Sequence, residues 1–190
     1  MNGTDEELMT ALQTGAANAA FDELVARYGK KLLNFFLRSG VIYDAEDLVQ
    51  QTFLRLYRYR YRYMPNAKLS TFIYMLARQT WIDELRRRKR RGGVMMPMED
   101  GLAEKVESGE KSPSQESDAR QDVLKALDCL SDPLRQVVVL GAIEELPYSE
   151  VAEILGIPEG TVKSRMFNAL AKMREFLEKD GDNDNKGTSC

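Results

Sequence analysis

The sequence of 190 residues contains no histidine, only two cysteines and a single tryptophan. The lack of histidine excludes a histidine-containing zinc site and any catalytic triad that uses histidine as its base. Cys129 and Cys190 are far apart, so a disulfide framework is not expected, and Cys129 is expected to be a small core residue. No carboxylate pair or metal-binding cluster stands out. We therefore expect a protein that is not an enzyme and that holds no metal and no cofactor.

Long apolar runs are also absent. No stretch approaches the roughly 20 apolar residues that a membrane span needs. The opening "MNGTDEELMT" is polar and acidic and lacks the basic head and apolar stretch of a signal peptide. We expect a cytoplasmic protein that makes no membrane contact of its own.

The formal net charge of -3 is unevenly distributed along the chain. Residues 1–92 hold 16 basic and 10 acidic side chains, residues 93–121 hold 3 and 7, and residues 122–178 hold 6 and 10. The middle segment combines Gly-Gly, Pro97 and Ser-Pro with many Glu, Ser and Lys residues, which is typical of a linker. Such asymmetry indicates separate surfaces for separate partners.

Apolar residues recur at helical spacing on both sides of this segment, which predicts an all-α fold. We expect two small helical domains, at 1–92 and 119–178, joined by a flexible acidic linker at 93–118 and followed by a disordered tail at 179–190. "TDEE" at Thr4 is a capping-box pattern, and Gly156 suits a left-handed helix end. Further helix caps are expected at Asp44, Ser70 and Ser149. The expected core includes Val25, Leu32, Phe35, Leu48, Leu56, Ile73, Val123, Leu124, Leu127, Val151, Val162, Met166, Leu170 and Leu177.

The segment "DAEDLVQQTFLRLYR", residues 44–58, predicts a helix with two faces. Ala45, Leu48, Thr52 and Leu56 line the inward face. A second stripe contains a leucine among polar residues, and it consists of Asp47, Gln50, Gln51, Leu54 and Arg58. This stripe could dock a helix of another protein, or it could be an ordinary solvated face.

Tyrosine and arginine alternate in "YRYRYRYMPNAK", residues 57–68, where we expect a helix end that runs into a loop. Tyrosine rings can stack on unpaired bases while arginine and lysine follow the phosphates, although a surface loop without function is the alternative. The next helix, "LSTFIYMLARQTWIDELRRRKRR", ends in six consecutive basic residues, which favours nucleic acid as a partner over a solvated helix end. One face of that helix carries Gln79, Asp83, Arg86, Arg87 and Arg90.

The segment "YSEVAEILGIPEGTVKSRMFNALAKMREFL", residues 148–177, predicts two helices joined by a tight turn. Helix-turn-helix shapes also occur as plain packing units, but here the outward residues suit contacts with base edges and phosphates. They are Glu159, Gly160, Thr161, Lys163, Ser164, Arg165 and Asn168.

These three segments, in this order, resemble the extracytoplasmic-function (ECF) group of sigma factors of the sigma-70 family, which direct bacterial RNA polymerase to promoters and often serve a stress response. The resemblance covers nearly the whole chain. It implies that Asp47, Gln50, Gln51 and Leu54 bind the beta-prime clamp helices of core RNA polymerase, and that the helix-turn-helix residues given above read the minus-thirty-five element of promoter DNA. It also implies a contact with the beta flap and an anti-sigma factor that masks these surfaces. The residues that it implies for the minus-ten element are Tyr61, Tyr63, Asn66, Lys68, Gln79, Asp83, Arg86, Arg87 and Arg90.

This sequence differs from the family pattern at Gln79, where the family often has asparagine, and at Tyr74 and Met75, where it often has a Trp-Leu pair. Two other classes of function are open to a sequence of this kind. A stand-alone helix-turn-helix transcriptional regulator would use only the second domain. An enzyme acting on nucleic acid would need a catalytic set of residues, and none is visible in the sequence.

Overall fold

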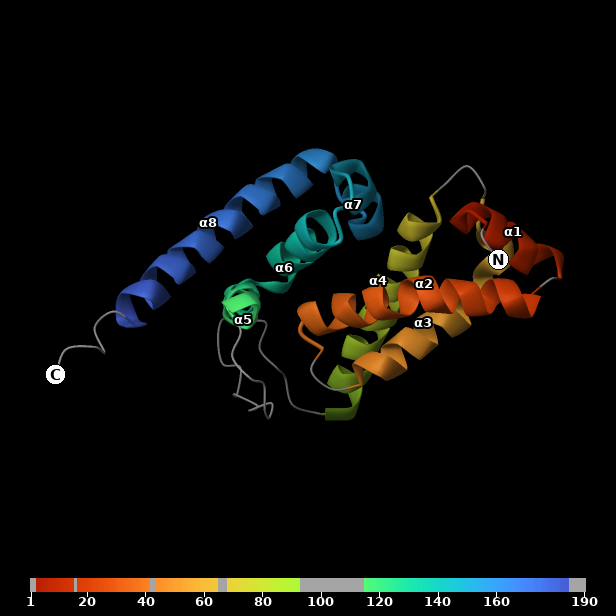
Figure 1. The fold of residues 1–190 in the computed structure, drawn as a ribbon, viewed down its shortest axis with the longest axis horizontal. Coiled ribbons are helices and arrows are strands. Elements are labelled where there is room, and N and C mark those ends of the chain that lie inside the picture. Colours follow the sequence, from red (N-terminus) through yellow and green to blue (C-terminus); the bar gives the residue numbers. More distant parts are fainter. Residues whose placement is uncertain (1–2, 16, 42–43, 65–67, 93–114, 185–190) are drawn as a thin grey trace.

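The structure is a computed structural model that describes residues 3–15, 17–41, 44–64, 68–92 and 115–184. All regular structure in these ranges is helical, so the all-α prediction is confirmed (Figure 1). No helix within them is both long enough and apolar enough to cross a membrane. In chain order the elements are α1 (Asp5–Thr14), α2 (Ala17–Arg38), α3 (Ala45–Tyr59), η1 (Arg60–Arg62), α4 (Leu69–Gly92), α5 (Gln115–Asp128), α6 (Asp132–Val138), η2 (Val139–Ile143), α7 (Tyr148–Leu155) and α8 (Glu159–Asp184).

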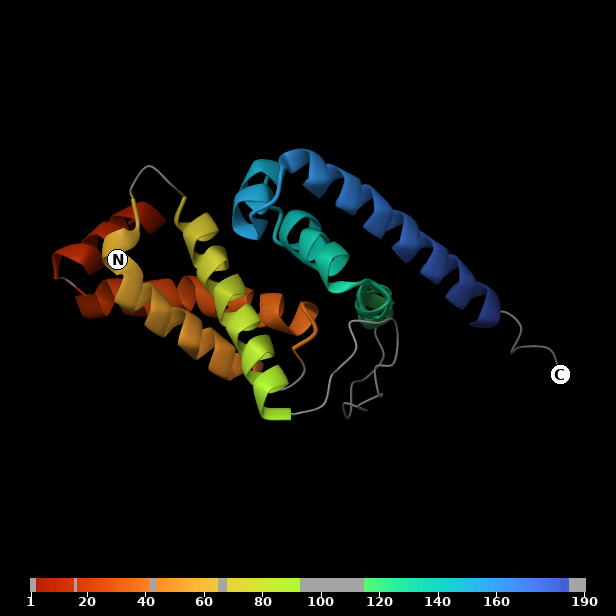
Figure 2. The same ribbon diagram turned by 180° about the vertical axis from the view of Figure 1, so that it is seen from behind.

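Helices α1 to α4 form the first bundle, which comprises the described residues between 3 and 92. Thr4 and Glu7 make the predicted capping box, because the Thr4 hydroxyl accepts from the Glu7 amide and the Glu7 carboxylate accepts from the Thr4 amide. The core is aliphatic and aromatic, with Phe35 in edge-on contact with both Phe36 and Tyr74. Figure 2 shows α3 and α4 crossing one another, with the C-terminal end of α3 beside α1.

Helices α5 to α8 form the second bundle, residues 115–184, in which α7 and α8 make the predicted helix-turn-helix. Gly156 ends α7 with a φ of 65°, and its amide donates to the carbonyl oxygens of Ala152 and Glu153. The turn holds Val151 and Ile154 against Val162 and Met166 of α8, and all four are buried. The predicted left-handed helix end at Gly156 is therefore confirmed.

Of the other expected caps, Asp44 holds the expected position without making the capping bond, and Ser70 and Ser149 are wrong. Asp44 stands at the N-cap of α3 in the left-handed region, but its side chain makes no capping bond and pairs instead with Arg88. Helix α4 begins at Leu69, one residue before Ser70, and the N-cap of α7 is Pro147, two residues before Ser149.

Several residues expected in the core are exposed. Val25 on α2, Val123 and Leu124 on α5, and Leu170 and Leu177 on α8 all have more than a third of their surface exposed. Cys129, expected to be a small core residue, is also exposed, and Cys190 lies outside the described residues. In Figure 1, α8 extends beyond α7, and α5 is the helix that contacts it toward its C-terminal end.

The two bundles pack against each other, chiefly through α4 and α7. The buried residues form one continuous cluster that spans both of them. At one edge of the contact, Arg135 of α6 donates to the carbonyl oxygens of Leu127 (3.0 Å), Asp128 (3.2 Å) and Leu130 (3.4 Å). Its guanidinium lies against Gly40, which follows α2 with a φ of 90°. The sequence predicted a tether between two domains but gave no sign of this contact.

The expected linker and tail are partly helical. Helix α5 begins at Gln115, inside the range 93–118, and α8 continues to Asp184, inside the range 179–190. Residues 93–114 and 185–190 lie outside the described residues.

Candidate polymerase and nucleic-acid interfaces

The polar stripe of α3 faces solvent. Asp47 and Gln50 are exposed, and Gln51 is half-buried. Leu54 lies among them with 66% of its surface exposed, while Leu48 and Leu56 on the opposite side of the helix are fully buried. An isolated apolar side chain within a row of hydrogen-bonding groups suits contact with another protein, because the leucine gains from burial and the polar groups orient the partner.

The Tyr-Arg segment forms the end of α3 and the short helix η1. The Arg60 guanidinium lies between two tyrosine rings, 4.2 Å from the centroid of Tyr57 and 4.4 Å from that of Tyr61. Gln13 of α1 fixes the backbone here, since its side-chain amide donates to the carbonyl oxygens of Arg60 (2.7 Å) and Tyr63 (3.1 Å). The segment is therefore an ordered cationic and aromatic surface.

The tyrosines of this segment differ in exposure. Tyr61 has 68% of its surface exposed, so its ring is available for stacking. Tyr63 has only 4% exposed, and its ring centroid lies 5.6 Å from that of Phe72. Burial raises the pKa of the Tyr63 hydroxyl. Tyr63 is a core residue in this structure, and Asn66 lies outside the described residues.

The exposed face of α4 carries the predicted basic residues. Gln79 and Arg90 are exposed, and the side chains of Arg86 and Arg87 are 73% and 47% exposed. Asp83 belongs to the same face but is paired, since its carboxylate accepts from Arg55 of α3 at 2.7 Å. The arginines therefore form a cationic surface that a polyanion can reach.

Ion pairs connect α3 and α4 at two places. Arg55 of α3 meets Asp83 of α4, and Arg88 of α4 meets Asp44 at the start of α3 (3.0 Å). Glu84, which is 6% exposed, also accepts from Arg88 (3.0 Å) and lies 2.6 Å from Arg87. The sequence pattern missed the two links between α3 and α4, because each joins residues that are distant in the chain.

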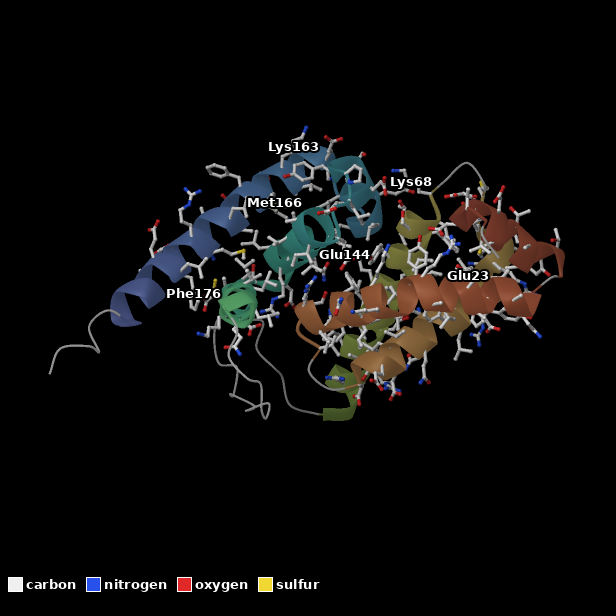
Figure 3. All side chains as sticks on the ribbon, in the orientation of Figure 1. Glu23, Lys68, Glu144, Lys163, Met166 and Phe176 are labelled. Carbon is white, nitrogen blue, oxygen red and sulfur yellow. The ribbon has the colours of Figure 1, made fainter. Side chains whose placement is uncertain are left out.

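The recognition end of α8 is open to solvent. Glu159, Gly160, Ser164 and Asn168 are exposed, and Thr161 and Arg165 are half-buried. The Lys163 side chain is 62% exposed and forms an ion pair with Glu159 (2.9 Å), whose hydrogen bond raises the pKa of the lysine. Figure 3 shows Lys163 on the outer side of α8, pointing away from the rest of the molecule.

Gly160 leaves open space around the start of α8, since a Cβ at this position would meet no heavy atom within 4 Å. A close approach of the helix backbone to a ligand is therefore sterically possible there. Together with the exposed Lys163 and Asn168, this gives α8 the donor and acceptor groups that major-groove readout uses.

Comparison with known proteins agrees with this arrangement. Residues 21–91 match the family model for sigma-70 region 2, and residues 120–173 match the model for sigma-70 region 4. The ECF RNA polymerase sigma factor SigE of Mycolicibacterium smegmatis is 34% identical over 184 residues, covering 93% of this chain and 70% of the relative. The ECF RNA polymerase sigma-E factor of Haemophilus influenzae is 31% identical over 186 residues, covering 92% and 94%.

A solved structure shares the fold. It is that of the sigma factor RpoE from Bartonella quintana in complex with the anti-sigma factor NepR, with a TM-score of 0.67 at 24% identity. The match covers 83% of this chain and 96% of the other.

Full-length similarity to these relatives decides against the stand-alone regulator and against the enzyme, because both halves of the chain match regions of one kind of transcription factor. This protein binds core RNA polymerase and promoter DNA, and it directs transcription initiation without being an enzyme. The chain belongs to the ECF RNA polymerase sigma factors of the sigma-70 family.

Proposed function

We propose that the two domains have separate binding functions. Residues 1–92 bind core RNA polymerase and the minus-ten element, and residues 119–178 bind the minus-thirty-five element. The observation that carries the proposal is the placement of three exposed surfaces on three separate helices. They are the polar stripe around Leu54 on α3, the arginine face of α4 and the Lys163 end of α8. The acidic segment 93–118 is suited to basic channels of the polymerase, because it carries negative charge as nucleic acid does.

On α3, Asp47, Gln50, Gln51 and Leu54 are assigned to the clamp helices of the beta-prime subunit. Leu54 supplies apolar area and the polar groups supply orientation. The exposed apolar residues of α8, among them Phe167 with 74% of its surface exposed, suit the beta flap. Polymerase thereby fixes where both DNA-binding surfaces lie.

The minus-ten element is assigned to the first bundle. Arg86, Arg87 and Arg90 neutralise phosphates, and Gln79 is placed for hydrogen bonding to a base. Asp83 orients Arg55 and Arg86, with which it forms ion pairs. Tyr61 offers a ring to a base that has left the stack, and Lys68 binds the backbone. Asn66 belongs to the family assignment, whereas the buried Tyr63 supports this surface from the core and is not assigned a contact with DNA.

The minus-thirty-five element is assigned to Glu159, Gly160, Thr161, Lys163, Ser164, Arg165 and Asn168. The second bundle grips duplex DNA upstream while the first bundle captures bases that are exposed as the strands separate. The cost of unstacking is offset by stacking on protein aromatics and by neutralisation of the backbone.

An anti-sigma factor is the expected regulator, and the cytoplasm is the expected location. Support comes from the Bartonella quintana sigma factor, which shares this fold and was solved with the anti-sigma factor NepR. Such a partner would cover the polymerase-binding and DNA-binding surfaces until a signal releases it.

Co-purification with core RNA polymerase followed by promoter-dependent transcription tests the assignment on α3. Leu54→Ala should weaken association by about 2 kcal/mol, which is roughly thirtyfold in Kd, because the leucine would be buried in the complex. Leu37→Ala is the matched control, since Leu37 of α2 is also an exposed leucine (46%) of the first bundle. Equal affinities for the two variants would refute the assignment.

Binding to an upstream promoter fragment by the holoenzyme tests the assignment on α8. Lys163→Ala should weaken recognition by about 1–3 kcal/mol if a base contact is lost. Lys179→Ala is the control, because Lys179 forms the same kind of pair with Glu175 (2.7 Å) four residues earlier on the same helix. A loss of equal size in both variants would point to general charge attraction and not to a specific contact.

A further inference from the structure

A carboxylate of the second bundle occupies the start of α4. Glu150 of α7 places one oxygen 2.5 Å from the Lys68 ammonium and accepts from the Thr71 hydroxyl with the other, at 2.9 Å. The Glu150 side chain is only 13% exposed, and Thr71 is 3% exposed. Figure 3 places Lys68 at the end of α4 that lies beside α7. Two donors, Thr71 in the first turn of α4 and Lys68 directly before the helix, therefore converge on one carboxylate, and each binds a different oxygen.

This arrangement has the chemistry of a phosphate site. A phosphodiester also presents two anionic oxygens, and lysine and threonine are among the side chains that bind them in protein–DNA complexes. The site lies at the first turn of a helix, where the backbone amides add a partial positive charge. The bound Glu150 carboxylate is the independent sign that the position accepts an anion.

We propose that Lys68 and Thr71 form an oxyanion site for a phosphate of single-stranded promoter DNA, and that Glu150 fills this site while the two bundles are packed together. The inference rests on the proposed function, because Lys68 is one of the residues assigned to the minus-ten element. Thr71 is a further DNA-binding residue, and Glu150 is a competitor of DNA that the protein itself carries.

A second contact one turn along α4 supports the competition. Tyr74, which is 2% exposed, donates to the Glu144 carboxylate at 2.5 Å, and burial together with this bond raises the pKa of the tyrosine. Both acceptors belong to the second bundle, and the donors belong to α4 or, for Lys68, to the residue directly before it. DNA and the second bundle therefore cannot use the same atoms of α4 at once, so DNA binding at this site requires α7 to leave.

The full-length chain without polymerase and a short fluorescent oligothymidylate provide the test, read by fluorescence anisotropy. Glu150→Gln removes the competing charge and should raise the affinity about tenfold, since a charge-assisted bond of this kind holds the packed form. Glu153→Gln is the matched control, because Glu153 lies on the same helix, is exposed, and removes the same charge. Equal affinities for the two variants would overturn the proposal.

A second set of variants tests whether Lys68 and Thr71 themselves bind the phosphate. In the Glu150→Gln background, Thr71→Val should lower the affinity several-fold, and Lys68→Gln should reduce the slope of log K against log salt by about 0.7, the value for one phosphate on a single strand. An unchanged slope with Lys68→Gln, or an unchanged affinity with Thr71→Val, would overturn the site.

Promoter-dependent transcription by holoenzymes with the same variants separates this inference from the proposed function. If the wild-type chain directs transcription but Glu150→Gln gains no affinity for DNA, only the competition is refuted. If the wild-type chain does not associate with polymerase, the assignment of the domains fails first.

Discussion

Replacement of Gly40 by alanine should destabilise the first bundle for two separable reasons. Gly40 follows α2 with a φ of 90°, a conformation that costs an alanine about 1–2 kcal/mol. A Cβ at this position would also lie 2.5 Å from a terminal nitrogen of Arg135. The guanidinium cannot move aside freely, because it donates to three carbonyl oxygens at the end of α5 and the start of the following turn.

Displacing Arg135 from these carbonyl oxygens should cost roughly a further 1–2 kcal/mol. The sum for Gly40→Ala is then about 2–4 kcal/mol in the free energy of unfolding. Gly15→Ala is the matched control. Gly15 ends α1 with a φ of 103°, yet a Cβ there would meet nothing within 4 Å, so only the backbone cost of about 1–2 kcal/mol applies.

Urea denaturation followed by tryptophan fluorescence measures both variants. Trp81 is the single tryptophan and is 6% exposed within the first bundle, so its emission reports on the bundle that contains both glycines. The same two variants are then made in an Arg135→Ala background. There, Gly40→Ala should lose only as much stability as Gly15→Ala, which gives a coupling of about 1–2 kcal/mol between Gly40 and Arg135.

Two results would refute this reasoning. If Gly40→Ala and Gly15→Ala lose equal stability in the wild-type background, the Arg135 contact contributes nothing. If Gly40→Ala loses the same amount with and without Arg135, α6 does not pack on the end of α2 in solution.

Three further perturbations test the first bundle. Thr4→Ala removes the capping box of α1 and should lower the free energy of unfolding by about 1 kcal/mol in the same urea assay, and a loss below the measurement error would contradict the capping bonds. Phe35→Ala removes a buried ring and should lower the free energy of unfolding by about 3–5 kcal/mol. Phe167→Ala, at a site that is 74% exposed, should change the free energy of unfolding very little, and equal losses for the two variants would contradict the burial of Phe35. Burial and the bond to Asp5 raise the pKa of Tyr28, so its contribution to stability is complete below its unfolded pKa of about 10 and is lost as the pH rises beyond it. The stability of the wild type should therefore fall more steeply above about pH 10 than that of Tyr28→Phe, and parallel pH profiles would contradict this.

Local chemistry was readable from the sequence at two helix ends where all the partners lie within a few residues, although the caps expected at Ser70 and Ser149 were wrong. The capping box at Thr4 and the left-handed Gly156 are of this kind, because the donors and acceptors belong to one helix end. The exposed stripe around Leu54 was also readable, since helical spacing alone separates it from the buried Leu48 and Leu56.

Contacts between distant segments were not readable. Asp44 was expected to cap α3, but Arg88, which lies 44 residues away, competes for its carboxylate. Leu170 and Leu177 follow the apolar period of α8, yet both are exposed, because helical spacing alone does not specify how far the other helices cover this face. The contacts of Glu150 with Lys68 and Thr71 arise from the packing of two bundles, and no sequence period carries that information.

The links between α3 and α4 have a mechanical consequence. These helices pack together and are braced by Arg55 with Asp83 and by Arg88 with Asp44. Under the proposed assignment, one helix meets the polymerase and the other meets the DNA, and the packing and ion pairs between the two helices couple their orientations. The angle at which the polymerase binds α3 would then set the direction in which the arginines of α4 point. Binding of α3 to the polymerase would therefore also orient α4 toward the DNA.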